Sequence, residues 1–109
     1  MDYLILKLSD KDNKVPFNNE KKLISRANGS WRITPTKLGD TDRALLLYRG
    51  QVLEEYEIGN SIIFDRKNNR TTFDMKVKKN SKYKGKSLEY KTANPASIVS
   101  RVKLNRILV

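Results

Sequence analysis

Residues 43–58, RALLLYRGQVLEEYEI, contain the clearest structural pattern of the chain. The first half of this stretch is apolar throughout the centre, which is typical of a β-strand covered on both faces. Gly50 then supplies a turn, and in the second half Val52, Tyr56 and Ile58 are predicted to share one face of a strand. The two halves together predict a β-hairpin.

Further strands are predicted on both sides of this hairpin. The apolar run YLILKL, residues 3–8, predicts a buried strand, and residues 61–64 predict a short one. Residues 70–77 alternate strictly between polar and apolar side chains, which predicts a single half-buried strand. Residues 97–104 fit a helix or a strand equally well, and residues 105–109 predict a closing strand.

Two short helices and two loops complete the predicted fold. Residues 20–26 fit a helix that ends at Asn28-Gly29, and Thr34-Pro35 supplies a cap and a first-turn proline for a helix reaching about residue 41. Residues 9–19 are predicted to form a polar loop, and residues 78–86 a basic loop. The predicted class is α+β: a small, mostly antiparallel β-barrel with one or two short helices, forming a single domain over residues 1–109.

The composition excludes several kinds of site. The chain has 109 residues with no cysteine and no histidine, so disulfides, the usual zinc sites and the commonest nucleophile–base pairs are unavailable. The sequence lacks an apolar run of the roughly 20 residues that a membrane span needs, and it lacks the features of a signal peptide at its start. We therefore expect a cytoplasmic protein without a cofactor or bound metal, and not an enzyme.

The net charge of +11 is distributed unevenly along the chain. Residues 1–65 contain 10 Lys/Arg and 10 Asp/Glu, whereas residues 66–109 contain 13 Lys/Arg and only two acids, Asp74 and Glu89. Such a block attracts polyanions through its summed field and through the release of counterions. We expect nucleic acid, DNA or RNA, as the partner, and we expect the surplus cations to converge on one face of the molecule.

Basic and aromatic residues alternate within this block, which is a pattern typical of nucleic-acid binding. Lysine outnumbers arginine, and this favours contact with phosphates over the reading of bases. The candidate contacts are Arg66, Lys67, Arg70, Lys76, Lys78, Lys79, Lys82, Tyr83, Lys84, Lys86, Lys91 and Arg101.

Two other functions are consistent with the sequence. Asp74 with Glu89-x-Lys91, or Asp65 with Asp74-x-Lys76, has the form of a Mg²⁺-dependent nuclease motif, although the same spacing is common in ordinary surface charge. Alternatively, the chain is a small protein of the kind found in phages or mobile elements that binds a complex handling nucleic acid.

Three segments resemble those of PUA-like β-barrel domains. They are RANGSWRI at residues 26–33, the hairpin of residues 44–58, and YKGKS at residues 83–87 followed by Ala-Asn-Pro at residues 93–95. A tryptophan expected after the second hairpin strand is replaced by Gly-Asn-Ser at residues 59–61.

This resemblance implies a β-barrel flanked by short helices, used in RNA-modification and DNA-restriction proteins to read nucleic acid. It implies that Arg26, Trp31 and Asn94 lie near a binding cleft, with Arg32 beside them. Trp31 is the only tryptophan, and a single tryptophan also fits a place in the core.

Overall fold

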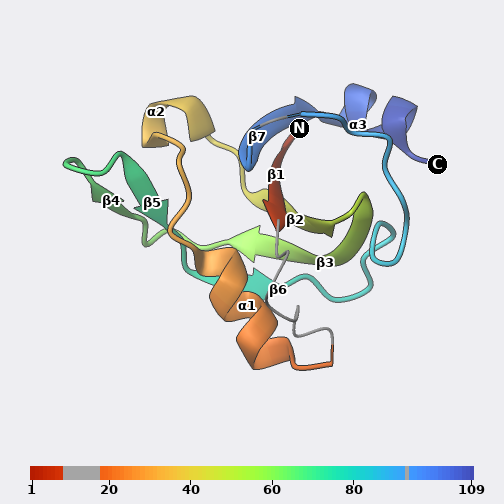
Figure 1. Cartoon of the computed structure of the whole chain (residues 1–109), viewed down its shortest axis with the longest axis horizontal. Helices are drawn as coiled ribbons and strands as arrows, with labels where there is room; N and C mark the ends of the chain where they lie inside the picture. Colours follow the sequence, from red (N-terminus) through yellow and green to blue (C-terminus); the bar gives the residue numbers. More distant parts are fainter. Residues whose placement is uncertain (9–17, 93) are drawn as a thin grey trace.

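The computed structural model describes residues 1–8, 18–92 and 94–109 (Figure 1). Within these ranges the chain has an α+β fold, mostly sheet with three short helices, so the predicted class is confirmed at this level. In chain order the elements are β1 (Asp2–Leu8), α1 (Glu20–Asn28), α2 (Pro35–Leu38), β2 (Arg43–Tyr48), β3 (Gln51–Ile58), β4 (Ile63–Asp65), β5 (Arg70–Thr72), β6 (Met75–Val77), β7 (Ala96–Ser100) and α3 (Arg101–Ile107). Most of the predicted loop at residues 9–19 lies outside the described residues.

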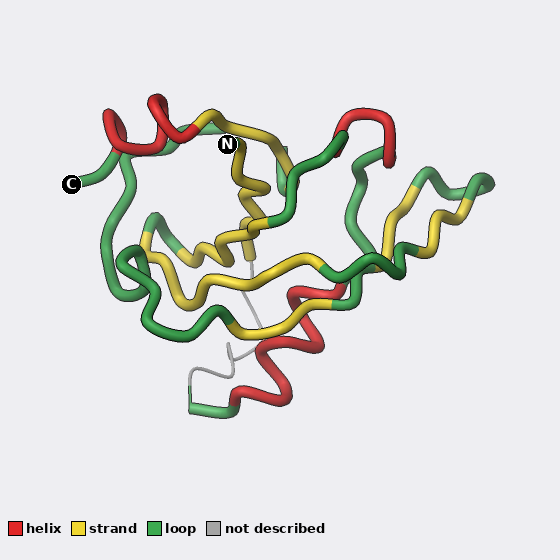
Figure 2. Tube along the Cα trace, turned by 180° about the vertical axis from the view of Figure 1, so that it is seen from behind, coloured by secondary structure: helices red, strands yellow, loops and turns green. Residues whose placement is uncertain are grey.

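Five strands form the main sheet in the order β6-β3-β2-β1-β7, and β4 pairs with β5 in a separate two-stranded sheet (Figure 2). In the main sheet β1 and β2 are parallel, while the other three neighbouring pairs are antiparallel. The predicted hairpin is present, and Arg49 and Gly50 both adopt positive φ at its turn, as a tight hairpin with right-handed twist requires. In the described part of the chain no ladder joins β6 to β7, so the expected closure into a barrel is not seen.

A hydrophobic core lies on each face of the main sheet. Leu4, Leu6 and Leu46 belong to the core that packs against α1, while Ile5 and Leu45 belong to the other core. Four consecutive residues of β2 are buried for this reason, which confirms the prediction of a strand covered on both faces.

A β-bulge in β3 divides the face predicted for Val52, Tyr56 and Ile58. Leu46 pairs with Glu54, but Leu47 pairs with Val52, so β3 has one extra residue at this point. An extra residue reverses the alternation beyond it. Val52 therefore packs in one core and Tyr56 in the other, and the prediction that they share a face is wrong.

Residues 70–77 form two strands, not the single strand predicted. Their alternation is correct, since Thr71, Phe73 and Met75 are buried. However, Asn28 at the end of α1 accepts two hydrogen bonds of 2.8 Å from this segment. Its carbonyl accepts from the amide of Phe73, and its side chain accepts from the amide of Met75. These bonds divert the backbone after β5. In addition, the carbonyl of Asp74 accepts a 2.8 Å hydrogen bond from the amide of Gly59.

The C-terminal segment contains both of the structures that its sequence left open. β7 ends at Ser100, whose side chain caps α3 by accepting a 3.1 Å hydrogen bond from the amide of Lys103. The helix continues to Ile107, so the predicted closing strand at residues 105–109 is wrong. Among the described residues, a single bridge between Leu88 and Leu108 is formed there.

Candidate nucleic-acid interface

Trp31 is held at the C-terminal end of α1. The helix begins with a cap from Asn19 and buries Leu23 and Ala27 against the sheet. It ends at Gly29, where φ is +94°, and the chain then turns so that the Trp31 indole Nε1 donates a 2.8 Å hydrogen bond to the carbonyl of Ala27. The indole thus satisfies one of the carbonyls that every helix leaves unpaired at its end.

The segment around Trp31 pairs with β5. Trp31 and Thr71 exchange two backbone hydrogen bonds of 2.8 Å, and Arg70 Nη1 donates to the carbonyl of Ser30 at 3.4 Å. Through this pairing Arg32 and Arg70, which are 38 residues apart in sequence, lie on the lining of the same cavity.

The end of β1 completes this surface. The amide of Lys7 donates to the carbonyl of Pro95 at 2.8 Å, and its Nζ donates to the carbonyl of Thr92 at 2.6 Å. Because of these bonds the segment before β7, which contains Asn94, lies beside the last residues of β1.

Between these segments lies a cavity of about 580 Å³, called here the Trp31 cavity. Its volume is within the range of sites that bind small molecules. The described residues that line it include four basic side chains and no acidic one. The lining consists of Lys7, Leu8, Ser25, Arg26, Gly29, Ser30, Trp31, Arg32, Arg70, Asn94 and Pro95.

Five of the predicted site residues therefore come together in one place: Arg26, Trp31, Arg32, Arg70 and Asn94. Sequence reasoning missed Lys7, because a lysine inside an apolar strand gives no sign that its side chain will line a cavity. Residues 66–91 were predicted to be the main contact with phosphates, but Arg70 is the only residue of this segment that lines the cavity.

The role of Trp31 is mainly structural. Only 8% of the residue is exposed, and it belongs to the core beneath α1. The indole forms part of the cavity wall but offers little open ring surface on which a base could stack. The chemistry of the cavity is therefore set by its guanidinium and ammonium groups, which bind phosphate and carboxylate groups.

A second cavity of about 280 Å³ lies on the other side of the sheet, and it has mixed charge. It contains the buried Glu55, whose carboxylate lies 3.7 Å from Arg43 Nε and accepts a 2.6 Å hydrogen bond from Ser81 Oγ. Burial, together with the neighbouring Tyr83 and Glu55, raises the pKa of Tyr3 to about 12. Four predicted site residues line this cavity: Lys78, Lys82, Tyr83 and Arg101.

The basic loop at residues 78–86 is anchored by buried groups. Lys84 Nζ lies 3.0 Å from the carboxylate of Glu54, a residue only 3% exposed, so this lysine already has an anionic partner. Tyr83 is 1% exposed and packs edge-on against Tyr3, with 5.5 Å between ring centroids. The prediction of Tyr83 as a nucleic-acid contact is corrected for this reason, because its ring faces the core.

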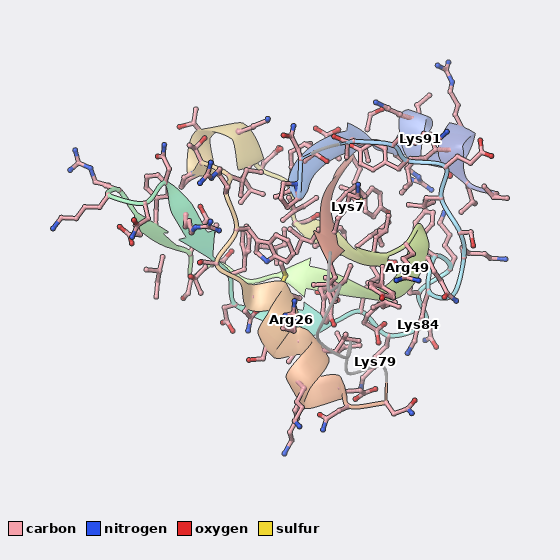
Figure 3. All side chains as sticks on the ribbon, viewed as in Figure 1. Lys7, Arg26, Arg49, Lys79, Lys84 and Lys91 are labelled. Carbon is pink, nitrogen blue, oxygen red and sulfur yellow. The ribbon has the colours of Figure 1, made fainter. Side chains whose placement is uncertain are left out.

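The surplus cations of residues 66–109 come from segments at different ends of the molecule, and their convergence on one face stays a prediction. The β4–β5 hairpin, with Arg66 and Lys67 in its turn, lies at one end of the molecule, while the basic loop and α3 lie toward the other (Figures 1 and 2). Figure 3 shows Lys91 near α3, apart from Lys79 and Lys84. The remaining predicted contacts, Lys76, Lys79, Lys86 and Lys91, are exposed and line neither of the two cavities.

Comparison with family models, with curated proteins and with solved structures gives no match. No helix in the described ranges is long and apolar enough to cross a membrane. Among the same residues there is no group of three or more acidic side chains that could hold a metal ion.

Proposed function

We propose that the chain binds nucleic acid without catalysing a reaction on it, and that the Trp31 cavity holds phosphate groups of the bound strand. The observation that carries the proposal is the charge of the cavity: Lys7, Arg32 and Arg70 line it, and no described lining residue is acidic. Arginine pairs with phosphate through two parallel hydrogen bonds, and lysine through its compact charge.

The net charge of +11 supports the same partner, because a polyanion gains from the field of the whole molecule as well as from its contacts. Nucleic acid is favoured over a single small anion because basic side chains outside the cavity can make further contacts with the same polymer. A PUA-like fold remains part of this proposal, supported by the meeting of Arg26, Trp31 and Asn94 at one cavity.

The test is a salt series of binding to labelled single-stranded DNA, single-stranded RNA and duplex DNA, measured by fluorescence anisotropy. The cavity variant carries Lys7→Ala, Arg32→Ala and Arg70→Ala. If these side chains contact three phosphates, the slope of log K against log salt becomes shallower by about 2 on single strands, at roughly 0.7 for each lost contact.

A control variant removes the same number of charges elsewhere, through Lys79→Ala, Lys86→Ala and Arg106→Ala. All three side chains are exposed and lie outside the Trp31 cavity. This variant is expected to retain most of the wild-type slope. Equal loss in the two variants, with both folded by circular dichroism, would overturn the cavity as the binding site, and a wild-type protein that binds none of the three nucleic acids would overturn the function.

A further inference from the structure

The β4–β5 hairpin is a separate arm of the molecule. Its two strands pair from Ile63 with Thr72 to Asp65 with Arg70, and in the described part of the chain their one further pairing is the bridge between Thr71 and Trp31. Figures 1 and 2 show that the hairpin extends away from the five-stranded sheet at one end of the long axis. All four residues of its turn, 66–69, are exposed, so the tip is accessible to a partner.

The tip is held in one conformation by Asp65. Its carboxylate accepts hydrogen bonds from the amides of Lys67 at 3.0 Å and Asn68 at 3.4 Å, and from the side chain of Asn68 at 2.8 Å. Asn69 follows with φ at +55°, a conformation that asparagine tolerates better than most residues. No ion pair among the described residues involves Arg66 or Lys67, so the tip presents two cations on an ordered turn.

The second strand of the hairpin is equally well fixed. Thr71 in β5 is fully buried, and it bonds to Trp31 through both its amide and its carbonyl. Its hydroxyl also donates to the carbonyl of Ile33. The arm is therefore a stiff extension of the wall of the Trp31 cavity, and Arg70 belongs to both.

We propose that this arm enters the major groove of double-stranded DNA, an inference that rests on the proposed nucleic-acid binding. The major groove of B-form DNA is about 12 Å wide and 8.5 Å deep, and it admits a two-stranded β-ribbon. The exposed turn of residues 66–69 projects beyond the Asp65–Arg70 pair. Thr71, which is buried and bonded to Trp31, marks how far the arm can enter the groove.

The chemistry of the tip fits the base edges in that groove. Arg66 and Lys67 can donate to the O6 and N7 atoms of guanine, which are the commonest specific contacts of basic side chains. Arg70 pairs with Asp65 directly beside the turn, so with the tip inserted it lies where a phosphate bordering the groove would be bound. Duplex RNA is excluded as an equivalent partner because the major groove of the A-form is too deep and narrow for side chains to read.

The experiment compares duplex DNA, its separated strand and a duplex RNA of the same sequence. The tip variant carries Arg66→Ala and Lys67→Ala, and the control carries Lys21→Ala and Lys22→Ala on the exposed side of α1. We expect the tip variant to lose affinity for duplex DNA by about tenfold, the loss of roughly one good base contact. Its affinity for the single strand and for duplex RNA should change by less than about threefold.

Methylation of guanine N7, which lies in the major groove, provides a second readout on the wild-type protein. Methylated sites are expected to interfere with binding in one short patch of the duplex, and the tip variant should lose that interference. Groove insertion is overturned if the wild type binds duplex DNA without interference, or if the tip variant and the control bind it equally. Failure of the wild type to bind any nucleic acid would instead overturn the proposed function.

Discussion

Replacing Gly29 with alanine should destabilise the protein in two separable ways. Gly29 has φ at +94° and ψ at −160°, a region essentially reserved for glycine, and placing alanine there costs about 1–3 kcal/mol. A Cβ at this position would also overlap Cδ1 of the Trp31 indole. Overpacking of this kind adds roughly 1–3 kcal/mol, because the indole must leave its place between α1 and the sheet.

The matched control is Gly39→Ala. Gly39 also follows a helix, α2, with positive φ at +59°, but a Cβ there would meet nothing within 4 Å. It should therefore show the backbone cost alone. The difference between the two variants, about 1–3 kcal/mol, isolates the contact with Trp31.

Urea unfolding measures both variants, and Trp31 serves as the probe because it is the only tryptophan. With a slope of about 2 kcal/mol/M, the difference corresponds to a shift of roughly 0.5–1.5 M in the unfolding midpoint. The emission of Trp31 in folded Gly29→Ala should also move to longer wavelength, because the indole gains contact with water. Equal midpoints for the two variants, or an unchanged emission maximum, would refute the seating of Trp31 on Gly29.

Three further predictions concern charge and pH. Lys84→Ala should lower stability by about 1–2 kcal/mol in thermal unfolding, because it leaves the buried carboxylate of Glu54 without its partner, whereas removing a neighbouring exposed lysine should change little. Burial raises the pKa of Tyr3 to about 12, whereas the pKa in the unfolded chain is near 10. The neutral tyrosine therefore stabilises the fold fully below this unfolded value, and the stabilisation is lost as the pH rises toward 12. Tyr3→Phe should make this loss of stability less steep in a pH series of urea unfolding. The Asn68 side chain lowers the pKa of Asp65, so Asn68→Ala should raise that pKa in an NMR titration of the carboxyl, while an unchanged value would contradict the turn geometry.

Local patterns in the sequence predicted much of the fold. The apolar centre of residues 43–48 is buried on both faces, and Asn28-Gly29 and Thr34-Pro35 mark the end of α1 and the start of α2. The errors occur where a distant partner decides the outcome. Residues 70–77 divide because Asn28, more than 40 positions earlier, accepts their amides, and no local pattern reports that contact.

The candidate site was predictable only in part, for the same reason. Arg26, Trp31 and Arg32 lie close together in sequence and share the cavity, but Lys7 reaches it only through bonds to residues 92 and 95. Composition located the excess charge in residues 66–109, yet composition carries no information about where these side chains lie in the folded molecule. The fold sends these side chains to different ends of the molecule, and the cavity draws most of its cations from the first half of the chain.

The most direct measurement is an NMR titration of the labelled protein with a short DNA strand and its duplex. Nucleic acid bound at the Trp31 cavity should shift the backbone resonances of residues 29–32 and the side-chain Nε resonances of Arg32 and Arg70, while Lys79 and Lys86 change little. Saturable binding that shifts only residues 78–86 and α3, and leaves residues 29–32 unchanged, would contradict the assignment of the cavity as the phosphate site.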